Sequence, residues 1–385
     1  MNGHNDTKGK ARSRSLALGV FLIVVAVAAV LVGRFVMPNA NLRSLNPFAG
    51  LSTTTVTGVI GSEKREYFED PNVVKRLKQL GYEVNFTTAG SRKIAEQIDV
   101  TELDFAFPSS APAAEKVARQ NSNYSVTQPF YSPMTVATFQ PIVDILTREG
   151  VVSEQNGMNV IDMGAFIDLA DANTRWRDLG SEFPSPRTVQ VSTTDIRTSN
   201  SAAMYLSILA WEFADKDPDR ANDLDHLVQR ITPYFAGQGY TASTSAGPFA
   251  DYLSQGMGAA PMVLVYEAQF LGEQMKPNSR IKDSMVLLYP DPTVLATHSV
   301  VGISDNGKGF AETLANDEKL QELAAQHGFR PSNSGAFGPV MADNGLHPPE
   351  EYFATVDPPP YDKLERLITE VGKAYTDPPT TDEEE

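Results

Sequence analysis

Residues 53–61 read TTTVTGVIG, a β-branched run typical of a strand, and they begin the segment that decides the fold. An amphipathic helix pattern follows at residues 71–81, and Gly81 closes it. The same alternation of strand and helix patterns continues through residues 82–120. Strands that alternate with helices form parallel sheets, so we expect an α/β fold with loops gathered at the carboxyl ends of the strands.

A second α/β set follows, with a predicted strand at residues 188–194 and an apolar helix pattern directly after it. Two long extended runs, at residues 132–146 and 285–304, are expected to cross between two lobes. Near the C-terminus, apolar residues recur with helical spacing at Leu364, Leu367, Ile368 and Val371. Two lobes joined by two crossings form a hinged cleft, which suits closure around a ligand.

The N-terminal part predicts a membrane anchor. Leu16–Gly33 is an uncharged apolar run of 18 residues, about 27 Å long as a helix at 1.5 Å per residue. Basic residues precede it, so the positive-inside rule leaves the N-terminus in the cytoplasm and places the rest outside the cell. A cleaved signal peptide is the alternative. The expected parts are a cytoplasmic basic segment at 1–15, a transmembrane anchor at 16–37, a linker at 38–52, lobe 1 at 53–135 and 290–375, lobe 2 at 136–289, and a disordered acidic tail at 376–385.

Composition excludes several classes of function. The net charge is −16, which argues against nucleic acid because such partners require a basic face. The chain has no cysteine, so it forms no disulfide and no thiolate metal site, as is common in secreted bacterial domains. The five histidines show no metal-ligand spacing, and no nucleophile elbow or phosphate-binding loop occurs. We therefore expect no enzyme activity, no cofactor and no metal.

Small polar residues follow several predicted strands at one edge of the sheet. Hydroxyl groups and free helix N-terminal amides at such an edge can hold a polar or anionic ligand. The competing interpretation is that each residue only caps a helix, and Ser199 or Asn200 is the expected cap of the helix that follows. The candidate ligand-binding residues are Ser62, Ser91, Arg92, Ser109, Thr194, Ser199, Asn200, Ser201 and Tyr266.

Taken in order, these segments resemble the type 2 extracellular or periplasmic solute-binding proteins, in particular their molybdate-binding-protein-like branch. The likeness spans Thr54 to Ala374 and rests on GVIGS (58–62), TTAGSRKIAEQI (87–98), VSTTDIRTSNSAAMYLSIL (191–209) and GMGAAPMVLVYEAQFL (256–271). It implies a two-lobed fold that captures a small polar or anionic solute, with Tyr266 in the cleft, for an ABC-type importer. The alternative is a membrane-tethered sensor or assembly protein that uses the same fold without transport.

Charged residues in the loops depart from the neutral donors that this family uses for oxyanions. Glu63 and Lys64 lie in the first loop, and Asp195 and Arg197 lie in the loop before the lobe 2 helix. A carboxylate that faces the cleft alone would repel an oxyanion, whereas a paired Asp195 would leave that loop neutral. An oxyanion, a zwitterion and a sugar therefore all stay open. We expect His298 to be a structural residue of the return crossing.

Overall fold

The computed structural model describes residues 53–375 except 239–241, 243, 334 and 350–353. The expected basic segment, membrane anchor, linker and acidic tail, at 1–15, 16–37, 38–52 and 376–385, lie outside the described residues. No helix in the described part of the chain is long and apolar enough to span a bilayer.

Three parallel strands form one end of the sheet, as the alternating pattern predicts: β1 (Thr54–Ile60), β2 (Tyr82–Thr88) and β3 (Phe105–Phe107). Their side chains pack on both faces into what we call the first core. Most of its helical residues come from α2 (Arg65–Glu69), α3 (Pro71–Gln79), α4 (Ser91–Glu96), α5 (Ala111–Ala118), α13 (Asp305–Asn316) and α14 (Glu318–Gln326). The short helix η2 (Ser62–Lys64) lies between β1 and α2.

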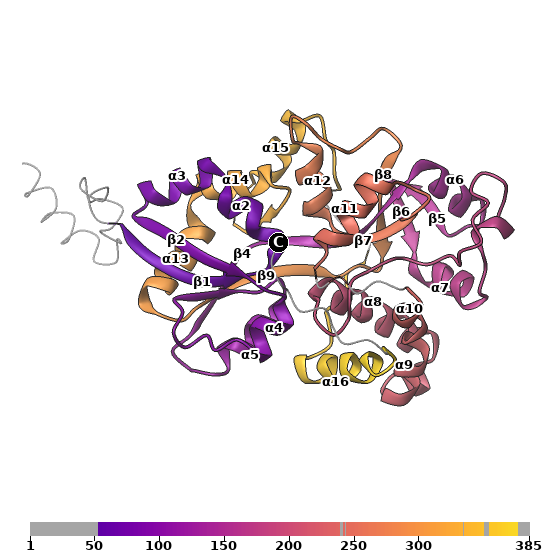
Figure 1. Cartoon of the computed structure of the whole chain (residues 1–385), viewed down its shortest axis with the longest axis horizontal. Helices are drawn as coiled ribbons and strands as arrows, with labels where there is room; N and C mark the ends of the chain where they lie inside the picture. Colours follow the sequence, from indigo (N-terminus) through magenta and orange to yellow (C-terminus); the bar gives the residue numbers. More distant parts are fainter. Residues whose placement is uncertain (1–52, 239–241, 243, 334, 350–353, 376–385) are drawn as a thin grey trace, which may run out of the picture. The chain divides into compact units, whose positions relative to one another are not determined.

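The long strand β4 (Ser125–Phe139) connects the two parts of the sheet (Figure 1). Its first half pairs with β9 (Leu295–Gly302), and its second half pairs with β7 (Met262–Tyr266) and β8 (Met285–Asp291). All three pairings are antiparallel. The crossing between the two parts is therefore a set of sheet strands, and one of them carries His298.

A second core surrounds the far half of β4. The strands at this end are β5 (Val152–Gln155) and β6 (Met158–Asp162). The helices around it are α6 (Gln140–Arg148), α7 (Met163–Asp171), α8 (Asn200–Lys216), α9 (Leu224–Ile231), α10 (Pro233–Ala236), α11 (Ala246–Gln255) and α12 (Glu267–Gln274), with the short helices η3 (Trp176–Asp178) and η4 (Pro218–Arg220). Helix α8 is buried along most of its length, because strands and other helices cover it.

Two extended segments expected from the sequence differ in the structure. The run at 132–146 is extended only as far as Phe139, and α6 begins at Gln140 because Pro141 fits a first helical turn. The expected strand at 188–194 forms no ladder. Only single-residue bridges occur there, including Ser192 to Val263 of β7.

The C-terminal region adds β10 (Arg330–Pro331), α15 (Phe337–Asp343) and α16 (Tyr361–Gly372). The expected apolar face of α16 is buried, and its side chains pack in the second core beside α8 and α9. This arrangement follows from the spacing of the apolar residues, since they form one stripe on the helix.

Candidate functional site

The loops after β1 and β3 approach each other closely at the predicted ligand edge of the sheet. A Cβ atom at Gly61 would overlap the side chains of Ser109 and Glu63, so a larger residue there would have to displace these side chains. A Cβ atom at Gly90 would lie 2.5 Å from the backbone oxygen of Thr198, in the loop before α8. Elements of the first and second cores are therefore in direct contact at this edge.

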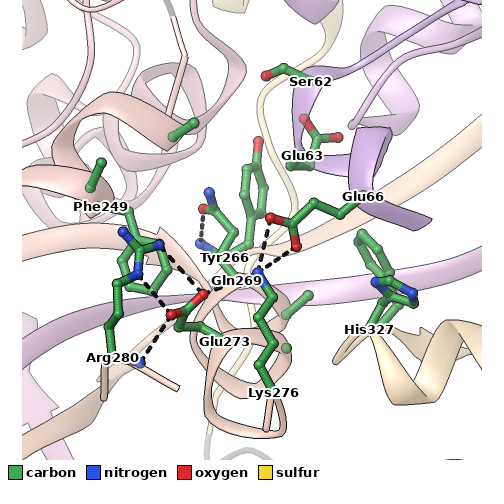
Figure 2. Close-up of a pocket in the computed structure, with 15 residues that line it drawn as sticks. Ser62, Glu63, Glu66, Phe249, Tyr266, Gln269, Glu273, Lys276, Arg280 and His327 are labelled. Carbon is green, nitrogen blue, oxygen red and sulfur yellow. Dashed lines mark hydrogen bonds and ion pairs between the residues drawn. The ribbon is translucent and has the colours of Figure 1, made fainter. Parts of the chain in front are cut away.

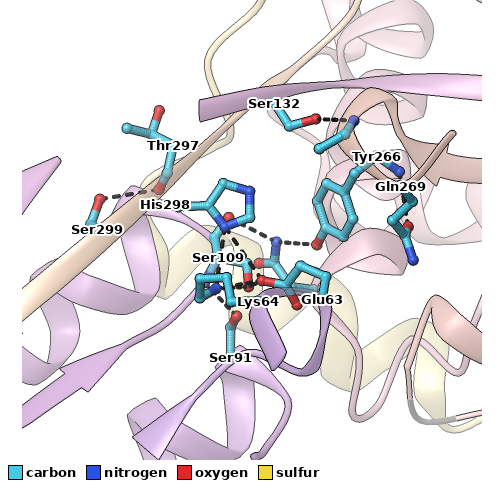
Figure 3. A network of polar contacts seen from close by, with 12 residues as sticks. Glu63, Lys64, Ser91, Ser109, Ser132, Tyr266, Gln269, Thr297, His298 and Ser299 are labelled. Carbon is cyan, nitrogen blue, oxygen red and sulfur yellow. Dashed lines mark hydrogen bonds and ion pairs between the residues drawn. The ribbon is translucent and has the colours of Figure 1, made fainter. Parts of the chain in front are cut away.

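A cluster of four polar side chains, which we call the Glu63 cluster, lies at the centre of this region: Glu63, Lys64, Ser109 and His298 (Figure 3). The Lys64 ammonium donates to Glu63 Oε1 and to Ser109 Oγ, the latter at 3.0 Å, and lies 3.2 Å from His298 Nδ1. Ser109 Oγ also donates to Glu63 Oε1. The side chains of Lys64 and His298 are fully buried, and that of Glu63 is 7 % exposed.

Burial and the mutual contacts set the charges of the Glu63 cluster. Burial alone raises the pKa of Glu63, but the Lys64 charge and hydrogen bonds from His298 and Lys64 hold that pKa far below its usual range. Burial also lowers the pKa of Lys64, and the neighbouring carboxylate opposes this change. Burial, followed by the charge of Lys64, lowers the pKa of His298 to about 4. At neutral pH the contacts thus keep the Glu63 carboxylate charged, and burial keeps the His298 imidazole neutral.

Four predicted residues belong to one network with this cluster. The Ser109 backbone N–H donates to Ser91 Oγ at 2.8 Å. Asn200 Nδ2, from the first turn of α8, donates to the Ser109 backbone oxygen at 3.3 Å and to the Tyr266 hydroxyl at 3.1 Å. Burial raises the pKa of Tyr266 above its usual range, so the phenol keeps its proton. Polar side chains from both cores therefore meet at Ser109.

Three further predicted residues form a separate neutral group, which we call the Ser201 cluster: Thr194, Ser199 and Ser201. Ser201 Oγ lies 2.9 Å from Thr194 Oγ1 and 3.0 Å from Ser199 Oγ, and all three side chains are buried. Ser199 holds the N-cap position of α8, but its side chain makes no capping hydrogen bond because it pairs with Ser201. The expected capping role is therefore wrong for the Ser199 side chain.

Arg92 lies at the rim of the network. Its guanidinium pairs with Glu365 of α16 at 2.7 Å and donates to the backbone oxygen of Arg197. Asp195 and Arg197 form an ion pair at 2.6 Å, and the Asp195 side chain is fully buried. The loop before α8 is thus neutral as a whole, which answers the question that the sequence left open.

A pocket of about 250 Å³ opens beside the Glu63 cluster, between η2, α11 and α12 (Figure 2). Two predicted residues, Ser62 and Tyr266, line it together with Glu63. On its other side Lys276 pairs with Glu66 at 2.8 Å and with Glu273 at 3.0 Å. The sequence did not indicate this charged wall, since the residues belong to separate elements.

Three members of the Glu63 cluster were not among the predicted ligand contacts: Glu63, Lys64 and His298. A Lys next to a Glu in a loop is usually solvated, so the sequence gives no sign that Glu63 and Lys64 are buried. The position of His298 in the return strand was the available signal, because that strand passes beneath the edge. No three His, Cys, Asp or Glu side chains in the described ranges are grouped to hold a metal ion.

No family model matches the chain, and no curated protein matches it. Among solved structures, iron-bound HitA from Pseudomonas aeruginosa aligns with a TM-score of 0.51 and 13% identity, covering 83% of this chain and 99% of that chain. The periplasmic binding protein P5PA aligns with a TM-score of 0.50 and 13% identity, covering 82% of this chain and 97% of that chain. The resemblance to periplasmic solute-binding proteins is therefore confirmed at the level of the fold.

Proposed function

We propose that this chain is a solute-binding protein whose two cores close around a small polar solute. The observation that carries the proposal is the meeting of polar side chains from both cores, where Asn200 of α8 donates to the Ser109 backbone at 3.3 Å. A ligand that contacts both sides stabilises the closed arrangement by its differential affinity for that state. The fold shared with a periplasmic binding protein supports the same function. We propose no chemical reaction.

We also propose that residues 16–37 anchor the protein in the cell membrane, with the folded part outside and an ABC-type permease as the partner. The apolar run and the basic residues before it support this proposal. Protease treatment of intact cells tests it: the folded part is expected to be digested from outside, and full protection of that part would contradict the orientation.

A thermal-shift panel on the purified full chain tests solute binding. Amino acids, sugars, short peptides and oxyanions are each added, and one class is expected to raise the midpoint. A hundredfold excess over Kd stabilises the native state by about 2.7 kcal/mol. The Asn200→Ala variant is expected to lose this shift, whereas Asn316→Ala, on α13, is expected to keep it because its exposed amide donates to the Glu312 backbone oxygen of the same helix. An equal shift in both variants would place the site elsewhere.

The second candidate is a tethered sensor or assembly protein with the same fold. It is favoured by the internal hydrogen bonding of the site, since the hydroxyls of the Ser201 cluster and the charges of the Glu63 cluster already have partners within the chain. A panel with no shift by any solute, together with a membrane protein crosslinked to the full chain in cells, would support this candidate over solute capture.

A further inference from the structure

The Glu63 carboxylate is held as a bound anion would be held. Its Oε1 atom accepts from Lys64 Nζ and Ser109 Oγ, and it lies 3.3 Å from His298 Nδ1. These three groups come from η2, the loop after β3 and strand β9. Groups on separate elements that converge on one carboxylate oxygen form an anion site built by the fold.

The surroundings of this site require an anion. Lys64 is fully buried, and its Nζ lies 4.8 Å from the centroid of the Phe107 ring. A buried ammonium needs a counter-charge because its desolvation is costly when it is unpaired. Among the hydrogen-bond partners of Lys64 in the described part of the chain, which are Glu63, Ser109 and His298, the negative charge comes from Glu63. The cluster therefore binds one negative charge, and the chain itself provides it.

We propose that the Glu63 cluster is an anion site whose occupant is the chain's own Glu63 carboxylate, so that free oxyanions are excluded from it. This inference rests on the proposed function and sharpens it: the captured solute carries no net negative charge. The solute then contacts the open pocket beside the cluster, which Ser62 and Tyr266 line. A second carboxylate or oxyanion at the cluster would face the Glu63 charge at close range, and like charges repel there.

The test is to remove the internal carboxylate and to supply an external one. In the full chain, Glu63→Ala leaves a space lined by Lys64, Ser109 and His298, so formate or acetate is expected to raise its thermal midpoint by several degrees. Salts also act generally on stability. Each salt is therefore compared with chloride at equal ionic strength, and wild type is measured beside the variant. Wild type is expected to show no shift beyond that in chloride.

Two further variants distinguish the loss of the Glu63 side-chain volume from the loss of its negative charge. Glu63→Gln fills the space with a neutral amide, so it is expected to lose stability without any rescue by formate. Glu66→Ala removes a carboxylate from the same pocket wall, where it pairs with Lys276 outside the cluster, and is expected to behave as wild type toward formate. The proposal would be overturned if formate raised the thermal midpoint of Glu63→Ala no more than that of wild type.

Titration of wild type provides a test that does not depend on the fold of any variant. Isothermal titration with sulfate, phosphate and molybdate is expected to give no heat of binding. Binding of one of these anions that Ser109→Ala abolishes would overturn the proposal. These outcomes differ from a failure of solute capture, in which wild type responds to no solute at all while Glu63→Ala is still rescued by formate.

Discussion

Two buried ion pairs lie near the centre of this protein, and they serve different purposes. Glu63 and Lys64 are consecutive residues, and their pair lies at the pocket. Glu267, the first residue of α12, accepts two hydrogen bonds from Arg330 of β10, at 2.7 and 2.9 Å. Tyr289 of β8 adds a third at 2.9 Å. Both pairs are almost fully shielded from solvent.

The difference is in what surrounds each carboxylate. The guanidinium of Arg330 matches the carboxylate of Glu267 in a two-pronged contact, which fixes α12 against β10. Neither residue lines the pocket beside η2. The Glu63 carboxylate is instead held by three unrelated groups next to open space. A buried charge therefore marks a binding site only where space adjoins it, and the following predictions test this distinction.

The largest effect is expected at the structural pair. Arg330→Met leaves the Glu267 carboxylate buried without a cation, so we expect a loss of about 3–5 kcal/mol in the free energy of unfolding. Urea denaturation of the full chain measures it. The double variant Glu267→Gln with Arg330→Met is expected to recover part of the loss, because no charge is left unpaired. A loss below about 1 kcal/mol for Arg330→Met would place this pair among ordinary surface pairs.

His298 of the Glu63 cluster is expected to contribute to the pH dependence of stability. The pKa of His298 is 6.5 in the unfolded chain, and burial lowers it to about 4 in the folded chain, so the unfolded chain binds more protons between these values. This one group therefore lowers stability as the pH drops through the window, by about 3 kcal/mol. Unfolding measured at several pH values is expected to show that His298→Gln loses less stability on acidification than wild type, and the difference between the two profiles isolates the contribution of His298.

Glu212 provides a control of opposite sign. Burial, then the charge of Asp162, raises the pKa of Glu212 to about 7. The folded chain thus binds more protons between 4.5 and 7, and this contribution to stability is lost as the pH rises. Glu212→Gln is expected to steepen the loss on acidification, whereas a flatter profile in that variant would contradict the assignment.

Removal of the cation at the site is expected to cost less than removal of Arg330. Lys64→Met leaves Glu63 with Ser109 and His298, so we expect a loss of about 2 kcal/mol. The same change removes the positive charge that lowers the pKa of His298. An NMR titration is expected to show that this pKa rises above about 4. An unchanged His298 pKa would mean that the two side chains are not coupled.

The neutral Ser201 cluster should respond more weakly than either ion pair. Ser201→Ala leaves the hydroxyls of Thr194 and Ser199 without their shared partner, which costs about 1 kcal/mol. Ser254→Ala, on the exposed face of α11, is the matched control and is expected to stay within about 0.5 kcal/mol of wild type. Equal effects of the two changes would show that the cluster contributes nothing specific.

Local patterns in the sequence predicted the fold well. The alternation from residue 53 predicted β1, β2 and β3 with their helices, and the spacing of Leu364, Leu367 and Val371 predicted the buried face of α16. The hairpin between β5 and β6 was missed, although Asn156 and Gly157 carry the residues its turn requires, with φ of 52° and 78°. The core against which α16 packs is decided by contacts between distant segments, so no local pattern in the sequence predicts it.

The candidate site was predicted less completely for the same reason. Ser91, Ser109, Asn200 and Tyr266 follow strands or begin helices, so their convergence could be expected from the topology. The burial of Lys64 could not be expected, because it depends on β9, which brings His298 next to Lys64 of η2. A charged residue is expected to be exposed to solvent, unless an element distant in the sequence covers its side chain.

The adjacency of Glu63 and Lys64 has a consequence for competition between anions. A carboxylate attached one residue away from the ammonium is present at a high effective concentration, well above that of any dilute solute. A free anion must displace a competitor that cannot diffuse away. The abundance of chloride, phosphate or sulfate around the protein then has little influence on the occupancy of the cluster. If the proposed anion site is correct, selectivity against common anions is obtained from chain connectivity.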